Sequence, residues 1–186
     1  MNHNIPKSHI IQTNRFQLRA PSLQDASRIF SATRYKGFND GMPWEPPVSE
    51  DEIIEPINKS IEAWESGGGY SFTIVKKGTA ELLGRISIRK TAKGQVWNVG
   101  FWTHPASQKQ GIMTETLAGV LKFGFEELSA TRIEADYAVW NKASEKVLQR
   151  NGMEFVEYIE KGFMKRGEWV DENKLAIDRR TWEASF

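Results

Sequence analysis

The sequence predicts a single domain of the α+β class, on three observations. Its 186 residues lie within the size of one domain, and no linker-like stretch or change in composition divides them. Segments with the alternation of strands and segments with the period of helices both occur. Their order is several strands that include an antiparallel hairpin, then strand, long helix, strand, short helix, strand and strand. That order favours an α+β arrangement over a doubly wound parallel sheet.

The first strand and the first helix lie near the beginning of the chain. Alternating apolar and polar residues predict a strand over residues 15–19. Ser22 and Asp25 have the spacing of a capping box, in which each side chain binds the other residue's backbone N–H group. This spacing predicts that a helix begins there.

An irregular segment and a second helix follow. Residues 34–47 are too rich in Gly and Pro for regular structure and carry several aromatic residues, so we expect a shaped loop. Ser49 and Glu52 offer a second capping box. Pro56 is expected to kink or restart the helix that begins there.

The rest of the chain is expected to hold six strands and two helices. They are a hairpin of strands at 71–75 and 83–88, a strand at 96–103, a long helix at 110–128, a strand at 132–139, a short helix at 141–150, and strands near 154–159 and 173–178.

Composition excludes several classes of function. With 25 basic and 24 acidic residues the net charge is +1, so no overall field favours binding to nucleic acid or to a membrane. The absence of Cys excludes a disulfide and a cysteine acyl intermediate, which favours direct group transfer. His3, His9 and His104 lack metal-ligand spacing, so no metal site is expected.

Residues 1–8 read as a polar leader before one domain at 9–186. The leader lacks the apolar run of a signal peptide, and no stretch approaches the ~18 apolar residues that span a bilayer. We therefore expect a cytoplasmic protein.

A phosphate cradle is expected where the long helix begins. The run there is Gln108, Lys109, Gln110, Gly111, Ile112, Met113 and Thr114. Helix N-termini leave backbone N–H groups free and carry partial positive charge, and Gly111 lets the backbone approach a pyrophosphate closely. The alternative is that Gly111 only makes a tight entry to an ordinary helix. A nucleotide-hydrolysing loop is disfavoured, because no Gly-Lys-Ser/Thr follows in frame.

These motifs resemble the GNAT acetyltransferases, in particular the RimJ/RimL type. The resemblance runs over residues 13–180 and rests on several motifs in order: Gln108-x-x-Gly111-x-Met113, Thr114-Glu115, Asn141-Lys142-Ala143-Ser144, Asn151-Gly152-Met153 and Val99-Gly100-Phe101-Trp102. It implies the GNAT fold, with a mixed, mostly antiparallel sheet of about seven strands flanked by about four helices. It also implies acetyl transfer from acetyl-CoA to a primary amine, either a protein N-terminus or a small amine.

The resemblance also implies roles for residues along the cofactor. The run from Gln108 to Thr114 would donate N–H groups to the pyrophosphate, and Phe101, Trp102 and Thr103 would pair with the pantetheine arm. Asn141 would reach the arm from the other side, although Asn is also a preferred N-cap. Ser144 would donate a proton to the leaving thiolate, unless it is a plain solvent-facing Ser.

The base that would deprotonate the amine is less evident. Many relatives carry a Glu where this sequence has Asn98, which cannot act as a base. Deprotonation is then expected to depend on water and on the acceptor's own acidity. His104 is a second candidate by its ordinary pKa, about 6.5, although a single His before Pro105 is typical of a loop.

The acceptor is expected between the loop at 34–44 and the hairpin near 165–169. Tyr35, Asp40, Trp44 and Glu45 are the candidates to hold an amine, although the aromatic pair would equally cover the core. Either a monomer or a homodimer is compatible with the sequence. A catalytically silent acyl-CoA-binding or partner-binding module remains the alternative function.

Overall fold

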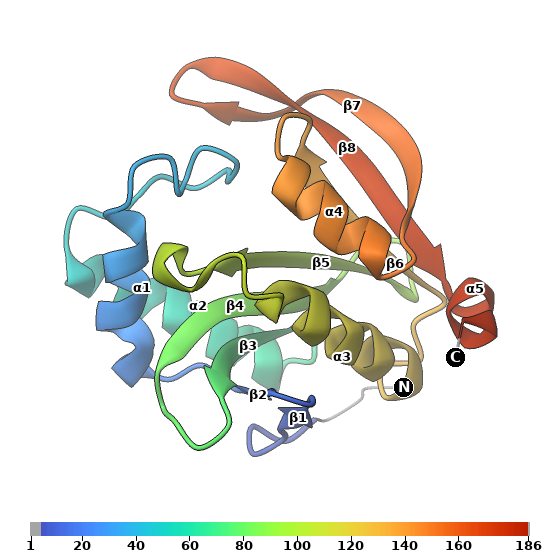
Figure 1. Cartoon of the computed structure of the whole chain (residues 1–186), viewed down its shortest axis with the longest axis horizontal. Helices are drawn as coiled ribbons and strands as arrows, with labels where there is room; N and C mark the ends of the chain where they lie inside the picture. Colours follow the sequence, from blue (N-terminus) through green and yellow to red (C-terminus); the bar gives the residue numbers. More distant parts are fainter. Residues whose placement is uncertain (1–4, 186) are drawn as a thin grey trace.

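The structure is a computed structural model that describes residues 5–185, and it is built on one sheet (Figure 1). The sheet has eight strands in the order β1-β2-β3-β4-β5-β6-β8-β7. The strands are β1 (Ile11–Gln12), β2 (Phe16–Arg19), β3 (Gly69–Lys76), β4 (Leu82–Lys90), β5 (Val96–Thr103), β6 (Arg132–Ala138), β7 (Glu154–Lys165) and β8 (Glu168–Asp178). All neighbours pair antiparallel except β5 and β6, which are parallel.

Helices cover both faces of the sheet. The α-helices are α1 (Ala26–Thr33), α2 (Ile54–Glu65), α3 (Ile112–Glu126), α4 (Lys142–Arg150) and α5 (Arg179–Ala184), and the 3₁₀ helices are η1 (Leu23–Asp25), η2 (Glu50–Ile53) and η3 (Pro105–Ser107). In Figure 1, α3 and α4 lie in front of the sheet and α2 lies behind it. None of the helices in residues 5–185 has the length and apolar character needed to cross a membrane.

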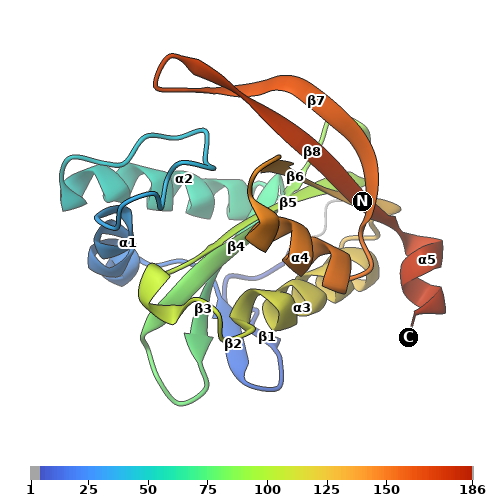
Figure 2. The same cartoon turned by 45° about the horizontal axis from the view of Figure 1, so that its top comes forward.

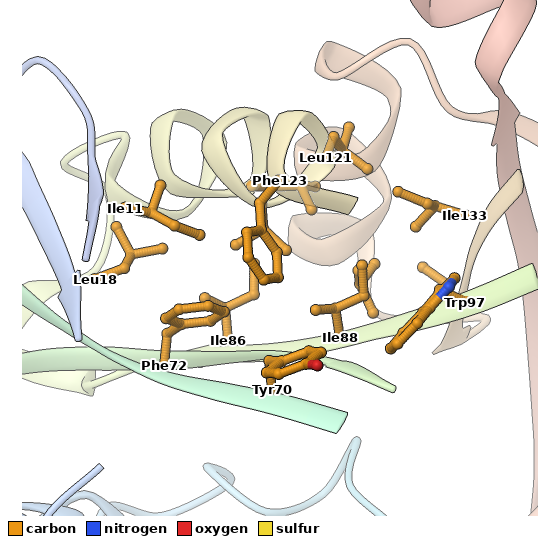
Figure 3. Close-up of a cluster of buried hydrophobic side chains, with 14 of the residues drawn as sticks. Ile11, Leu18, Tyr70, Phe72, Ile86, Ile88, Trp97, Leu121, Phe123 and Ile133 are labelled. Carbon is orange, nitrogen blue, oxygen red and sulfur yellow. The ribbon is translucent and has the colours of Figure 1, made fainter. Parts of the chain in front are cut away.

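The main core lies between α3 and the sheet (Figure 3). Phe123 of α3 packs edge-on against Tyr70 and Phe72 of β3, with ring centroids 5.6 and 5.5 Å apart. The helix approaches closely at Gly124, where an added Cβ would lie 2.7 Å from Ile133 and 2.8 Å from Ile88. The long amphipathic helix of the sequence is therefore held directly on β4 and β6.

The parallel pair β5 and β6 opens partway along its length. Only three residue pairs connect the two strands, from Val96 with Arg132 to Asn98 with Glu134. Beyond these pairs β5 continues along β4, while β6 continues along β8. The sheet therefore has an opening beside the last five residues of β5.

The α+β class and the mixed, mostly antiparallel sheet are confirmed, with small differences in the count. The described residues contain eight strands and five α-helices, where about seven and four were expected. The additional elements are β1 and α5, which are two and six residues long and too short to show a period.

β7 is longer than its pattern indicated, because a register irregularity between Ile159 and Phe163 breaks the alternation. Lys161 has φ +56° at this irregularity. The strand nevertheless continues to Lys165.

Of the two expected capping boxes, the first is confirmed. The Ser22 side chain accepts from Gln24 N, and Asp25 accepts from Ser22 N. Ser49 makes no such bond, so the second prediction is wrong: Glu52 instead accepts from the backbone N–H of Val48 at 2.9 Å. Pro56 lies in the first turn of α2, where a missing N–H is tolerated. The change from 3₁₀ to α-helix comes before it, between Ile53 and Ile54.

Candidate active site

A cleft of about 700 Å³ lies at the opening between β5 and β6. It is bounded by the end of β5, the loop from η3 to α3, the middle of β6, the first turns of α4 and the loop after α1. Of the residues expected to bind substrates, those that line it are Tyr35, Phe101, Trp102, Thr103, Gln108, Lys109, Gln110, Gly111, Ile112, Met113, Asn141 and Ser144.

Thr114 is not among the lining residues. It lies in the first turn of α3, where its carbonyl oxygen accepts from the side chain of Asn151 at 3.2 Å. Its part in the cradle is therefore limited to its place in the helix terminus.

The cradle has the backbone that an anion site requires. Gly111 is the N-cap of α3 with φ +71°, and Lys109 also has a positive φ, of +62°. The bond from Glu115 N to Gly111 O, at 3.2 Å, is the first bond of the helix. The N–H groups of Ile112 and Met113 therefore have no intrahelical partner, and both residues line the cleft.

A brace that the sequence did not reveal fixes this cradle. Glu115 accepts from the Arg15 backbone N–H at 2.7 Å, from Arg15 Nε at 2.6 Å and from Thr13 Oγ1 at 2.7 Å. Burial alone would raise the pKa of Glu115, but these hydrogen bonds outweigh it and lower that pKa. Arg15 Nη1 also donates to Gln110 O at 3.0 Å, which ties the start of β2 to the loop.

Basic side chains line the cleft near the cradle. Lys109, Lys146 and Arg150 border it, and none of the three has an ion pair within the part of the chain that the structure describes. Lys146 and Arg150 are four residues apart on α4, a spacing that places them on one face. The site thus offers positive charge as well as N–H groups to phosphate.

Asn141 and Ser144 come together at the start of α4. Asn141 is the N-cap, and its side-chain oxygen accepts from Ser144 N at 3.1 Å. The capping role expected for Asn141 is confirmed. Asn141 also lines the cleft, and its amide Nδ2 lies near the loop after α1, 3.3 Å from where a Cβ added to Gly41 would lie. No described protein group hydrogen-bonds to the Ser144 hydroxyl, which also lies on the cleft.

His104 lies away from the cleft. Its side chain is buried, its Nδ1 accepts from Ala106 N at 3.2 Å, and its Nε2 is 2.9 Å from Ser31 Oγ. Ser31 Oγ donates to Arg28 O, so the imidazole donates from Nε2 and is neutral. Burial, together with the charge of Arg28, lowers the pKa of His104. This geometry makes His104 the cap of η3, with both of its ring nitrogens engaged.

A carboxylate stands at the opening instead. Asp136 of β6 lines the cleft, and the side-chain amide of Asn98 donates to it at 2.9 Å. Burial raises the pKa of Asp136, against the opposing effects of Lys174 and Asn98. Alternation along β6 gave no hint of this residue, because a charged residue on the polar side of a strand is the ordinary case.

Three of the expected acceptor residues are engaged with the hairpin of β7 and β8. Lys165 Nζ donates to Trp44 O at 2.7 Å and lies 3.2 Å from Glu45 Oε2, while Arg166 lies 3.3 Å from Asp40. We refer to these contacts of Lys165 and Arg166 as the loop–hairpin latch. Figure 2 shows the tip of the hairpin reaching toward the loop after α1.

The aromatic candidates divide between two places. Tyr35 lines the cleft, with its ring edge-on to His104 at 5.5 Å between centroids. Trp44 packs edge-on against Phe38, which in turn packs against Trp102. Trp44 therefore packs within the loop after α1, and it is not among the residues that line the cleft. No group of three His, Asp or Glu side chains within residues 5–185 is placed to hold a metal ion.

Comparison with known proteins gives a consistent result. Residues 15–154 match the family described as the acetyltransferase (GNAT) domain. The uncharacterized N-acetyltransferase YoaA of Bacillus subtilis is 27% identical over 175 residues, which are 90% of this chain and 96% of that protein. The [ribosomal protein uS5]-alanine N-acetyltransferase of Escherichia coli is 24% identical, over 96% of this chain and 95% of that enzyme.

A solved structure shares the fold. RimL, a ribosomal-protein alpha-N-acetyltransferase in complex with coenzyme A, superposes with a TM-score of 0.83 at 20% identity, over 91% of this chain and 98% of that one.

Proposed function

The chain belongs to the GNAT acetyltransferase family, and from this premise we propose that it acetylates the α-amino group at a protein N-terminus or the amine of a small molecule. Transfer of acetyl from acetyl-CoA to an amine is the activity of this family. The observation that carries the proposal is the cleft at the opening of the sheet, with a cradle of free N–H groups at one end.

The residues present fit acetyl-CoA as the donor. The turn of Lys109 and Gly111 and the first N–H groups of α3 would receive the pyrophosphate, and Lys146 and Arg150 would add positive charge. Phe101, Trp102 and Thr103 have no partner strand on the β6 side, so their backbone would pair with the pantetheine arm as with an added strand. Asn141 would reach the arm from α4.

The reaction we propose is direct attack in a ternary complex. The chain has no Cys to carry an acyl intermediate, so the neutral amine attacks the thioester carbonyl and the C–S bond breaks. Ser144 lies on the cleft, and its hydroxyl has no hydrogen-bond partner among residues 5–185, so it would donate a proton to the departing thiolate. We do not assign the base to His104, because both of its ring nitrogens are engaged.

The relatives support a protein N-terminus as the acceptor. The enzyme of Escherichia coli acts on a ribosomal-protein alanine, and an acceptor of that kind would place this enzyme in the cytoplasm. Tyr35 and the loop after α1 border the acceptor side of the cleft. We propose that Asp40, Trp44 and Glu45 act there indirectly, by holding this loop in place.

The test is release of free thiol from acetyl-CoA. The protein is incubated with acetyl-CoA and, separately, with peptides of different N-terminal residues, polyamines and amino acids. Thiol release that requires the amine, together with an acetylated product of +42 Da by mass spectrometry, is expected. Binding of acetyl-CoA without thiol release for any amine would instead indicate a silent acyl-CoA-binding module.

A further inference from the structure

The opening between β5 and β6 carries an acidic side chain on the face opposite the cradle. Ile133, Ala135 and Tyr137 of β6 pack in the core beneath α3, so Asp136 points to the other face. On β5, Trp97 and Val99 are in that same core, which places Asn98 beside Asp136. Asp136 lies two residues beyond the last parallel pair, where β6 no longer has β5 as a neighbour.

Asn98 orients this carboxylate. Its amide nitrogen donates to Asp136 Oδ2 at 2.9 Å, and this leaves Oδ1 turned to Lys174 and the cleft. Asn98 itself carries no carboxylate, but it holds the carboxylate of Asp136, which comes from the neighbouring strand β6. A side chain of Ala or Leu at residue 98 would leave Asp136 without this bond.

Within the described residues, Asp136 has only a long ion pair, which it shares with another acid. Lys174, its cross-strand partner on β8, is 3.9 Å from Oδ1 but only 2.9 Å from Glu157 of β7. The other acidic neighbours are Glu134, which pairs with Arg132 at 3.0 Å and lies 4.0 Å from Lys93, and Glu172 of β8. Burial and then the charge of Asp136 raise the pKa of Glu172. The surroundings thus carry more negative than positive charge, which suits an ammonium group.

Resting on the proposed function, we propose that Asp136 binds the acceptor's ammonium group and removes its proton, with Asn98 as its positioning residue. The proton passes from nitrogen to the Asp136 carboxylate, directly or through one water, and leaves a neutral amine. Nitrogen then forms its bond to the acetyl carbon and loses a second proton as the C–S bond breaks. Ser144 donates its hydroxyl proton to the departing thiolate, which leaves as thiol, and Ser144 takes up the proton that nitrogen loses. Asp136 returns its proton to solvent, so each turnover releases one proton.

The pH profile of kcat/KM reports this role directly. The raised pKa of Asp136 sets an acid limb above the ordinary aspartate value of about 3.9, and that limb is the same for every acceptor. Without the carboxylate only the fraction of free amine reacts, so the rate rises with pH up to the acceptor's own pKa. That break lies at about pH 8 for a peptide α-amine and at about pH 10.4 for a lysine side chain.

The experiment compares wild type with Asp136→Asn, using one peptide α-amine and one lysine-type amine from pH 4.5 to 9. We expect Asp136→Asn to lower kcat/KM by about 10²-fold or more at pH 6.5, to lose the acid limb, and to recover as pH approaches the acceptor's pKa. Its affinity for acetyl-CoA should match wild type, since the cradle lies on the other face. Superimposable profiles of the two proteins would overturn the proposal.

Two further variants complete the test. Asp171→Asn, an acid-to-amide change on β8 at a residue that does not line the cleft, should stay within about twofold of wild type. Asn98→Ala should shift the acid limb to higher pH, because the lost hydrogen bond had lowered the pKa of Asp136. An unmoved limb would contradict the positioning role. Wild-type turnover, measured first, decides the proposed function separately from Asp136.

Discussion

Ser144 lies in the first turn of α4, where its backbone N–H is already bound by Asn141. Replacing it by Ala removes a hydroxyl without disturbing the cap. We expect Ser144→Ala to lower kcat by about 10-fold or more while the Kd for acetyl-CoA changes less than about twofold, because a proton donor to the leaving group acts in the transition state. Steady-state kinetics and calorimetry measure the two quantities.

Ser60→Ala is the matched control, since Ser60 lies on α2 and donates to Pro56 O outside the cleft. Its kcat should equal that of wild type. If Ser144→Ala also turned over at the wild-type rate while chemistry limits turnover, Ser144 would be only a cleft-lining residue.

Asp25 is the buried acid on which the N-terminal part of the sheet depends. Its carboxylate accepts from Arg19 at 2.6 and 3.1 Å, from Ser22 N at 3.0 Å and from Thr73 Oγ1 at 2.8 Å. Burial alone would raise its pKa, but these bonds and the charge of Arg19 lower it. A lowered folded-state pKa contributes stability above the unfolded value, and this is lost as pH falls through the folded value.

We therefore expect Asp25→Asn to lower the free energy of unfolding by about 3 kcal/mol at pH 7. The difference from wild type should shrink below about pH 3.9, where the unfolded carboxyl takes up its proton. Urea unfolding at pH 7 and pH 3 measures both values. Asp178→Asn, which breaks a solvent-exposed pair with Arg132, should cost less than about 1 kcal/mol. A constant difference at the two pH values for Asp25→Asn would contradict the assignment.

At the scale of single residues, the sequence predicted the backbone-dependent part of the site better than its side-chain chemistry. Gly111 and Asn141 have roles dictated by local geometry, a left-handed turn and an N-cap, which a motif records. Asp136 and His104 depend on neighbours distant in the chain: Asn98 for the first and Ser31 for the second. No local pattern reports such contacts.

At the scale of elements, the N-terminus of α3 can be tested directly through the affinity for acetyl-CoA. Gly111→Glu adds a side chain and a negative charge where the cradle faces the cleft, and we expect the Kd for acetyl-CoA to rise at least about 100-fold by calorimetry. Gly78→Glu is the matched control, because Gly78 has a similar φ of +79° with no atom within 4 Å of an added Cβ. Equal losses of affinity in both variants would show that strain, and not the anion, explains the effect.

The loop–hairpin latch links two elements that lie far apart in the chain. Lys165 is buried, with 6% of its side chain exposed, and its ammonium group binds Trp44 O. We expect Lys165→Met to free the loop after α1, so limited proteolysis between residues 36 and 48 should become several-fold faster. The KM for the acceptor should rise, while the Kd for acetyl-CoA should not change.

Lys161→Met, on the same strand but exposed, is the comparison for that experiment. It should leave both the proteolysis rate and the KM unchanged. A loop equally protected in Lys165→Met and in wild type would show that the ammonium group of Lys165 is not needed to hold it, because Arg166 and the packing of Phe38 and Trp44 remain.

Elements with an uninterrupted hydrophobic period were predicted with nearly their full length, whereas the hairpin that contains a register irregularity was not. The long helix and the strand at β5 appear where the pattern placed them, since each buries one regular face. The hairpin of β7 and β8 was underestimated because of the irregularity that contains Lys161. Pairing across a bulge is decided by tertiary contacts, which the alternation of one strand does not record.

At the scale of the whole molecule, the fold class was predictable because the order of elements is itself a constraint. β5 is followed by the long helix α3 and then by β6, which lies beside β5 in the sheet. A helix that connects two neighbouring strands in this way makes them parallel. Neither the helix nor the alternation of the two strands indicates that they part after three residue pairs. Past that point β6 stays paired with β8, a contact between distant parts of the chain that no motif near β5 records.

The opening between β5 and β6 also has a consequence for steady-state kinetics. The cradle lies on the α3 face and Asp136 on the opposite face. With the acceptor at Asp136, as proposed above, donor and acceptor would approach from the two sides of the sheet, and neither would block the other. We therefore expect random-order addition, with double-reciprocal plots that intersect. Desulfo-CoA should be competitive toward acetyl-CoA and noncompetitive toward the amine. Parallel lines would indicate a covalent acyl-enzyme, which a chain without Cys would have to form on another nucleophile.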